Sequence, residues 1–189
     1  LRIAISSTAS DHKFIADPIC FSAVPGSTFA YWVGPSVCSV FSRLPQFKDG
    51  SGRNACMTNP AGDDTRFFRA SWEVALDTIG REIRWVPLAK GGTFSPYYAD
   101  IYLLVDWDCR SESYRGFLGT IHRPMSKPAS LDYFFRPGLT WPRRTNGLSF
   151  RALPAGAIFN DKGPAAFSPN DSEIELLATL ALMNSLAFK

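Results

Sequence analysis

The segment ADIYLLVDWD, residues 99–108, carries the clearest strand pattern of the chain, because apolar side chains alternate along it. The segment REIRWVPLAKGG at 81–92 predicts a second strand that ends at a glycine turn. RFFRASWEV at 66–74 alternates well enough for a third, and LSFRALPAGAIFN at 148–160 predicts two strands around a Pro-Ala-Gly turn. Short strands are therefore expected over much of the chain.

A helix is predicted where SPNDSEIELLATLALMNSLAF, residues 168–188, closes the sequence. Asp171 or Ser172 suits the N-cap position, and Glu173 and Glu175 suit the positive end of the helix dipole. Apolar residues cover more than one face of this helix. We therefore expect it to be buried or to pack against a further neighbour.

The N-terminal part predicts a shorter helix at 36–47, SVCSVFSRLPQF. Pro35 suits its first turn and Pro45 would end it. Residues 14–34 are broken by Pro and Gly and predict turns and short extended pieces, and residues 49–65 predict a loop.

The order of elements mixes strands and helices without βαβ regularity, which favours an irregular α+β fold. The 189 residues, 46% apolar and 20% charged, are typical of a soluble globular protein and predict one domain, residues 1–189. A short strand at 2–7 and a short helix at 111–120 complete the expected elements. The start at Leu1 suggests a piece of a longer protein.

Composition excludes several classes of protein. There is neither a signal-peptide pattern nor an apolar run long enough to cross a membrane, so we expect a cytoplasmic protein without a membrane partner. The cysteines and histidines lack the spacing of zinc ligands, which favours reduced, mostly buried thiols and no metal. They are Cys20, Cys38, Cys56, Cys109, His12 and His122.

A catalytic set is not visible. The glycines of GSG at 50–52 do not continue into a dinucleotide-binding motif, and neither a phosphate loop nor a nucleophile elbow is present. Asp106 and Asp108 fall on one face of the 99–108 strand and could hold a metal or work as a carboxylate pair. A polar strand end is the simpler interpretation.

A basic and aromatic stretch, FFRPGLTWPRRTNGLSFRALPAGAIFNDKGP at 134–164, indicates a binding surface. Nucleic-acid sites combine cations for phosphates with planar side chains that stack on bases. Phe67, Phe134 and Phe135 are better explained as core, and Trp141 either stacks on a base or holds its loop. The candidate DNA-binding residues are Arg53, Arg66, Arg69, Lys90, Tyr97, Arg136, Trp141, Arg143, Arg144 and Lys162.

Several of these segments together resemble the C-terminal part of large adenine-specific DNA methyltransferases. These are the PglX-type enzymes of BREX phage defence and the related type IIG restriction–modification proteins. The resemblance covers about residues 21 to 186. It rests on PGSTFAYWVG (25–34), GDDTRFFRASWEV (62–74), WVPLAKGGTFSPYYADIYLLVDW (85–107), FRPGLTWPRR (135–144), SFRALPAGAIFNDKGPA (149–165) and LLATLALMNS (176–185).

The resemblance implies a parent enzyme that transfers a methyl group from S-adenosylmethionine to N6 of an adenine flipped out of double-stranded DNA. That family's catalytic tetrapeptide has the form [Asn/Asp]-Pro-Pro-[Tyr/Phe], and the nearest strings here, DPIC and NPAG, do not match it. The glycine-rich cofactor motif is missing too. We therefore expect no cofactor in this chain. It resembles the target recognition domain, which works beside the methyltransferase domain of the same polypeptide.

The loops RPGLTWPRR at 136–144 and NDKGP at 160–164 are hypothesised to be rigid and to place Arg136, Arg143, Arg144 and Lys162 along a DNA groove. Residues 49–60 depart from the family pattern.

Other classes of function stay open. A protein-interaction module would use the same aromatic and arginine-rich surface to dock a catalytic domain or partner subunit. A metal-dependent hydrolase or nuclease would use Asp106, Asp108 or Glu112. A carbohydrate-binding module would expose Trp and Tyr but would not need clustered arginine.

Overall fold

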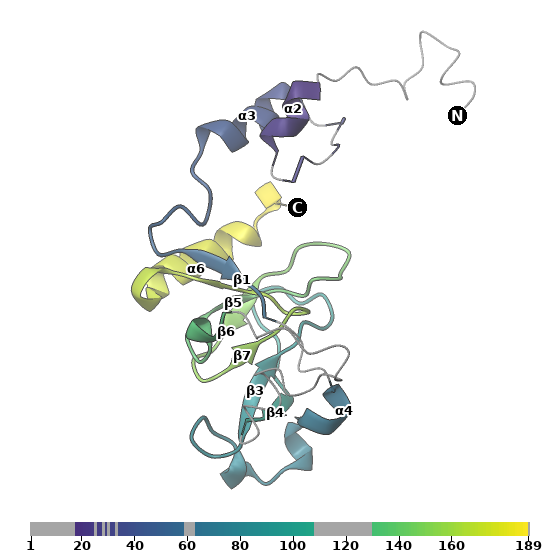
Figure 1. Ribbon diagram of the computed structural model, residues 1–189, viewed down its shortest axis with the longest axis vertical. Helices are drawn as coiled ribbons and strands as arrows, with labels where there is room; N and C mark the ends of the chain where they lie inside the picture. Colours follow the sequence, from purple (N-terminus) through teal and green to yellow (C-terminus); the bar gives the residue numbers. More distant parts are fainter. Residues whose placement is uncertain are drawn as a thin grey trace, which may run out of the picture. The chain divides into compact units, whose positions relative to one another are not determined.

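The computed structural model describes residues 18–24, 26, 27, 29, 31, 32, 34–58, 63–107 and 130–188 (Figure 1). The strand predicted at 2–7 and the helix predicted at 111–120 lie outside these residues. The chain divides into two compact units, Leu1–Asp49 and Gly50–Lys189. That residues 1–189 form one domain stays a prediction.

The first unit contains α2 (Pro18–Ala23) and α3 (Pro35–Arg43). The helix predicted at 36–47 is confirmed as α3, with Pro35 in its first turn and Leu44 as its C-cap. The prediction of turns and extended pieces was wrong for α2. Pro18 stands at the start of this helix, where its missing N–H costs no hydrogen bond.

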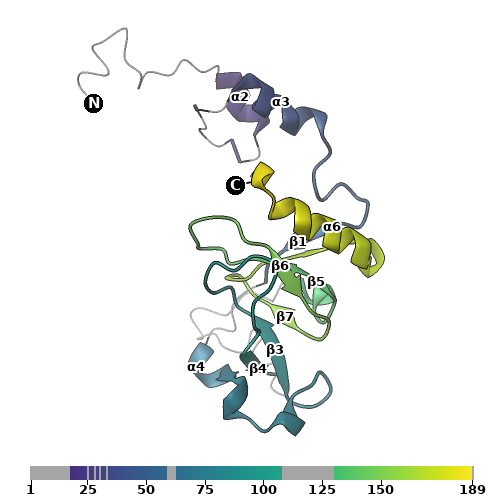
Figure 2. The ribbon, with the colours of Figure 1, turned by 180° about the vertical axis from the view of Figure 1, so that it is seen from behind.

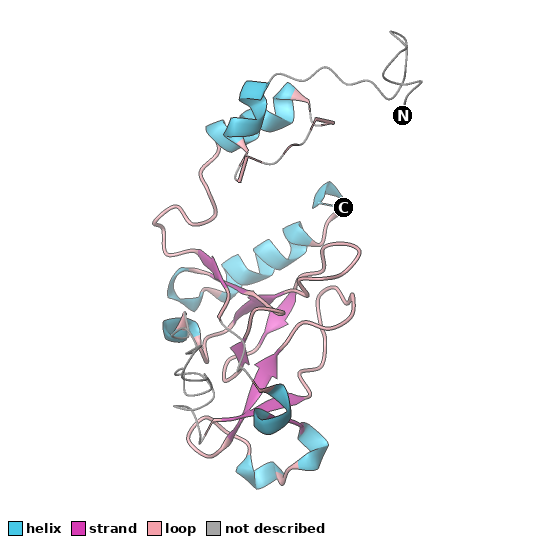
Figure 3. Ribbon diagram, turned by 45° about the vertical axis from the view of Figure 1, so that its right-hand side comes forward, coloured by secondary structure: helices cyan, strands magenta, loops and turns pink. Residues whose placement is uncertain are grey.

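The second unit holds two four-stranded sheets (Figures 1 and 3). The first is antiparallel throughout, in the order β1 (Asn54–Cys56), β8 (Ala165–Phe167), β5 (Gly138–Thr140), β6 (Arg151–Leu153). The second has the order β2 (Phe68–Ala70), β4 (Leu103–Asp106), β3 (Trp85–Ala89), β7 (Ile158–Phe159), in which β3 and β7 are parallel. The expected irregular α+β fold is confirmed.

The chain crosses between the two sheets at 154–157. Two strands around a Pro-Ala-Gly turn were predicted at 148–160, and both exist. They do not pair with each other, because β6 pairs with β5 and β7 pairs with β3. Gly156, with a φ of 86°, makes the turn that separates them. This turn therefore connects the sheets instead of closing a hairpin.

The predicted strand at 66–74 is shorter than expected. Helix α4 (Asp64–Phe67) precedes β2, and a 3₁₀ helix, η1 (Ser71–Glu73), follows it. The Asp63 side chain caps α4 by accepting from the backbone N–H of Arg66 at 3.0 Å. The Glu73 carboxylate accepts from the backbone N–H of Ala70 at 2.6 Å. These local side-chain bonds confine the extended backbone to β2.

Part of the loop predicted at 49–65 is also a strand, since β1 forms there by pairing with β8. The remaining short helices are η2 (Leu76–Thr78), η3 (Leu131–Tyr133), η4 (Pro169–Asp171) and η5 (Leu186–Phe188). Where the structure describes the chain, no helix combines the length and apolar character needed to cross a membrane.

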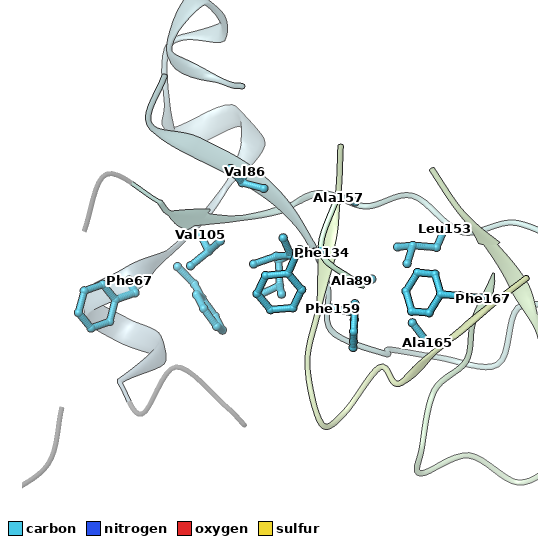
Figure 4. Packing of buried hydrophobic residues seen from close by; sticks show 13 residues of the cluster. Phe67, Val86, Ala89, Val105, Phe134, Leu153, Ala157, Phe159, Ala165 and Phe167 are labelled. Carbon is cyan, nitrogen blue, oxygen red and sulfur yellow. The ribbon is translucent and has the colours of Figure 1, made fainter. Parts of the chain in front are cut away.

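One apolar core is shared by both sheets (Figure 4). Phe134 and Phe159 lie in its middle, with Phe67 on α4 and Phe167 on β8. The rings of Phe134 and Phe159 meet edge to face, with centroids 5.3 Å apart. Phe67 and Phe134 are buried and Phe135 packs against them, so their assignment to the core is confirmed.

Helix α6 (Glu173–Met183) covers the first sheet (Figure 3). Ser172 is its N-cap, as one of the two predicted alternatives had it. Leu180 is buried in a second cluster with residues of β5 and β8, while Ile174 on another face is 81% exposed. Asn184, at the end of the helix, is buried. Its side chain accepts from the N–H of Phe150 (3.1 Å) and donates to the carbonyl of Phe150 (2.8 Å).

Asn184→Ala should lower the free energy of unfolding by about 1–3 kcal/mol, because the buried N–H of Phe150 loses its acceptor. Asn146→Ala, a change of the same side chain at an exposed loop position, is the control and should shift it by less than about 0.5 kcal/mol. Urea unfolding of the three proteins measures both values. Equal stability of the two variants would show that the hydrogen bonds between Asn184 and Phe150 do not stabilise the fold.

Candidate nucleic-acid interface

Two basic loops lie together in the second unit: residues 141–148, which follow β5, and residues 160–164, which follow β7. The backbone N–H of Arg143 donates to the carbonyl of Lys162 at 3.1 Å. The hydroxyl of Thr140 donates to the carbonyl of Pro164 at 2.9 Å. These bonds tie the start of the first loop to the second.

The loop at 160–164 is held from inside by a buried asparagine. The side-chain oxygen of Asn160 accepts from the backbone N–H groups of Lys162 (3.0 Å) and Gly163 (3.2 Å). An asparagine that bonds its own following backbone fixes a turn. This geometry supports the hypothesis that NDKGP is a rigid loop.

A third segment, the end of β3 and the glycines after it, touches the second loop backbone to backbone. A Cβ atom added to Gly163 would lie 2.6 Å from the N atom of Gly91 and 2.8 Å from the carbonyl oxygen of Ala89. Gly91 has a φ of 93° and faces the carbonyl of Lys162. Glycine is therefore required on both sides of this contact.

A cavity of about 190 Å³ opens where these segments meet. Figures 1 and 2 both show the green loop after β5 beside the teal loop after β3. Of the candidate DNA-binding residues, the fold brings four to this cavity. Its charged lining residues are Lys90, Arg143, Arg144, Lys162 and the single acid Asp161.

The cations of this cavity differ in how far they are neutralised. Lys90 forms an ion pair with Asp64 and lies 4.7 Å from the ring centroid of Phe68. Arg143, Arg144 and Lys162 are exposed, and within the described residues none of them takes part in an ion pair. We call these three residues the basic triad. Asp161 lines the same cavity, but no carboxylate of the described residues forms an ion pair with these three charges.

The other cationic candidates are engaged within the fold. The segment 136–144 was predicted as one loop, and this was wrong, because β5 runs through it. Arg136 precedes β5, at the opposite end from the basic triad, and pairs with Asp171 at 2.7 Å. Arg53 pairs with Glu175 at 3.3 Å. Their contact with DNA stays a prediction.

Arg69 and Arg66 lie near the start of β2. A guanidinium nitrogen of Arg69 donates to the backbone carbonyls of Thr65 (2.9 Å) and Phe68 (2.6 Å). The guanidinium of Arg66 lies over the ring of Phe67, 4.9 Å from its centroid. Neither residue lines the cavity of the basic triad, and their DNA contact also stays a prediction.

The aromatic candidates differ in their surroundings. Trp141 stacks on Phe150, with ring centroids 4.7 Å apart and planes 22° apart, in the cluster beneath α6. Holding its loop is therefore the role that the geometry favours for Trp141. Tyr97 is exposed. Its N–H donates to the carbonyl of Phe150, just before β6, at 2.7 Å, and its carbonyl accepts from the N–H of Ala152 on β6 at 3.0 Å.

The carboxylate candidates do not form a metal site among the described residues. Asp106 is buried, and its carboxylate accepts hydrogen bonds from two nitrogens of Arg84, the shorter of them 2.8 Å long. In the described ranges no group of three or more His, Cys, Asp and Glu could hold a metal ion. Asp108, Glu112, His12, His122 and Cys109 lie outside them. Asp106 therefore neutralises Arg84, the residue just before β3.

A larger cavity, of about 680 Å³, lies next to the first, and Lys90 and Gly92 line both. Sequence reasoning did not select its most unusual residue, Arg151, which is only 5% exposed. Burial lowers the pKa of this guanidinium from its usual value. At its rim, the hydrogen bond from Tyr98 to Asp100 (2.7 Å) raises the pKa of Tyr98. A charged side chain at an inward position of a strand pattern was the available signal for Arg151.

Gly163→Ala should destabilise the second unit by about 1–3 kcal/mol, because the added methyl group meets backbone atoms that cannot rotate away. Gly80→Ala is the matched control, since its methyl group would meet only the flexible side chain of Ile83. Thermal unfolding of both variants measures the difference. A Gly163→Ala variant as stable as Gly80→Ala would show that the loops are not in this close contact.

Comparison with known proteins finds two similar sequences. The chain is 28% identical over 171 residues to the adenine-specific methyltransferase BrxX of Escherichia coli O9:H4 (strain HS), a match that covers 87% of this chain and 13% of that protein. It is 29% identical over 179 residues to the adenine-specific methyltransferase PglX of Lacticaseibacillus casei (strain Zhang), covering 87% of this chain and 14% of that protein. No family model matches. The chain thus spans about one seventh of the length of these relatives, and the resemblance that its motifs indicate is confirmed over most of its residues.

Proposed function

We propose that this chain is the DNA-binding target-recognition region of an adenine-specific (N6) DNA methyltransferase of a restriction–modification or BREX phage-defence system. Two relatives named as adenine-specific methyltransferases match 87% of the chain. Because that name points to DNA as the substrate of the relatives, we assign the exposed cations of the second unit to contacts with DNA. On this proposal the chain works in the cytoplasm.

The observation that carries the proposal is the basic triad. Arg143, Arg144 and Lys162 stand on two loops that are tied by the bond between Arg143 and Lys162, and they carry no counter-ion within the described residues. Phosphate oxygens are the partners that such cations take, with release of condensed counter-ions from DNA. Because the loops are already fixed, little conformational entropy is lost when they bind.

The guanidinium groups of Arg143 and Arg144 also suit base reading. Arginine donates two hydrogen bonds to O6 and N7 of guanine in the major groove, while lysine acts on phosphate as a point charge. Trp141, packed on Phe150, is assigned to support of the loop. Specificity would then come from the arginines and not from stacking at this position.

Methyl transfer itself is assigned to the methyltransferase domain of the parent polypeptide, which would also hold S-adenosylmethionine. On this proposal the residues of this chain contribute contacts to DNA and take no part in the methyl transfer.

A second candidate is a protein-interaction module that docks a catalytic domain or partner subunit. It is favoured by the outer face of α6 and the turn after it, where Ile174 is 81% and Leu186 88% exposed. Leu177 and Leu182 are more than half exposed on the same helix. Apolar surface of this kind marks interaction sites. Binding to it would change little with salt, whereas phosphate contacts weaken steeply.

The proposal predicts that the chain binds duplex DNA of random sequence and that its affinity falls steeply between roughly 50 and 200 mM salt. The double variant Arg143→Ala, Arg144→Ala should bind at least about tenfold more weakly at the lower salt, with a salt slope reduced by about two. Fluorescence anisotropy of labelled DNA at several salt concentrations measures both quantities.

Arg81→Ala is the control, because Arg81 is exposed beside Glu82 and carries the same charge. It should leave the salt slope within about 0.5 of the parent value. No binding at low salt, or an unchanged slope in the double variant, would remove the support for DNA contact by the basic triad. If the chain instead bound a protein partner through Leu177 and this binding did not change with salt, the protein-interaction module would be favoured.

A further inference from the structure

The larger cavity has the dimensions of a ligand site. Its volume is about 680 Å³, within the range of small-molecule pockets. It is walled by the end of β3, the segment from Gly91 to Leu103, Thr140 of β5, and Arg151 and Ala152 of β6, so both sheets contribute to it. Arg151 stands on the β6 side. None of the candidate DNA-binding residues other than Lys90 lines it.

Arg151 is a buried cation whose hydrogen bonding is incomplete. One of its terminal nitrogens donates to the carbonyl oxygen of Gly91. Within the ranges that the structure describes, no carboxylate pairs with it. A guanidinium has five N–H donors, and none of the nitrogens of Arg151 is among the buried polar atoms that lack a partner, so its other donors are open to the cavity that it lines. The remaining donors of Arg151 therefore suit an anion that enters the cavity.

The rim of the cavity is aromatic. Tyr98 is 67% and Tyr102 50% exposed, and both line the cavity. The ring of Tyr102 stacks on Trp72 outside it, with centroids 5.8 Å apart. Exposed planar side chains are the surfaces on which nucleobases stack. Asp100, also at the rim, offers a carboxylate that accepts from amino groups of a base.

We propose that this cavity binds one nucleotide, with its phosphate at Arg151 and its base against the tyrosines of the rim. A simple inorganic anion would leave the aromatic rim unused, and an acidic peptide has no need of planar surfaces. Lys90 lines both this cavity and that of the basic triad, so the two sites adjoin.

The nucleotide can come from two sources, and in both of them it presents a phosphate and a planar base. It is either free in solution or part of a DNA strand whose neighbouring phosphates lie on the basic triad. The second source rests on the proposed function. Binding of a free nucleotide does not, so the two are separable by experiment.

The test is titration of the full chain with deoxyadenosine monophosphate, followed by calorimetry, beside titration with deoxyadenosine. The chain should bind the monophosphate at least tenfold more tightly than the nucleoside, because the nucleoside has no phosphate for Arg151. Arg151→Gln should lose at least tenfold in affinity for the monophosphate, and Arg81→Ala should not change it.

A merely structural Arg151 would behave differently. The proposal expects Arg151→Gln to unfold at the same urea concentration as the parent chain or a higher one, since a buried unpaired charge is removed. It expects the monophosphate to raise the unfolding midpoint of the parent chain only. Should Arg151→Gln fail to fold, Tyr98→Ala, at an exposed position, replaces it and should lose at least threefold in affinity.

Failure of the monophosphate to bind, or equal binding by the parent chain and the variants, would overturn the nucleotide site. Monophosphate binding without duplex binding would overturn the proposed DNA recognition and leave the nucleotide site standing. Duplex binding without monophosphate binding would overturn the nucleotide site and leave the proposed DNA recognition standing.

Discussion

The parallel pairing of β3 with β7 is the constraint on which the second unit depends. It places Leu88 opposite Ile158 and Ala89 opposite Phe159, so a strand from the middle of the sequence meets one from its C-terminal part. β7 reaches this position directly from β6, which belongs to the other sheet. The two sheets are thereby joined over one core. The same pairing brings Lys90 near Lys162, because Lys90 directly follows β3 and Lys162 lies three residues after the end of β7. Fold and basic surface thus have a common origin.

That origin explains why glycines, and not the cations, fix the geometry of the basic surface. Beyond the last paired residues the two backbones stay in contact at Gly91 and Gly163, where side chains have no room. Of the two lysines beside this contact, Lys162 is exposed, while Lys90 is half-buried against Phe68. Asn160 closes the turn from the inside, so the projection of Lys162 is set by buried groups.

Sequence reasoning succeeded for features with a local cause. The strand at 103–106, α3 and α6 follow from alternation, helical spacing and caps that lie within a few residues. β1 and the pairing of β3 with β7 were not predictable, because their hydrogen bonds join residues far apart in the chain. α2 was missed because Pro and Gly nearby were read as turns.

The candidate site shows the same division. A cluster of cations is visible in the sequence, but which of them are neutralised is not. Arg136 is paired with Asp171 and Lys90 with Asp64, partners 35 and 26 residues away. Arg143, Arg144 and Lys162 are exposed in loops, where the nearby Pro and Gly residues had indicated loops.

Two energetic costs coincide at the larger cavity. Arg151 is a buried cation, and Tyr97, bridged to it along the backbone, has a φ of 71°, in the left-handed region that non-glycine residues rarely adopt. Such conformations cost about 1–3 kcal/mol and persist only where surrounding structure imposes them. Here the imposing structure is β6 and the residue before it, because Tyr97 donates to the carbonyl of Phe150 and accepts from the N–H of Ala152. A smaller, uncharged residue at 151 would remove the charge but would leave the backbone of Tyr97 as it is, because main-chain hydrogen bonds hold it. On the proposed nucleotide site, a phosphate that enters the cavity would compensate the charge of Arg151.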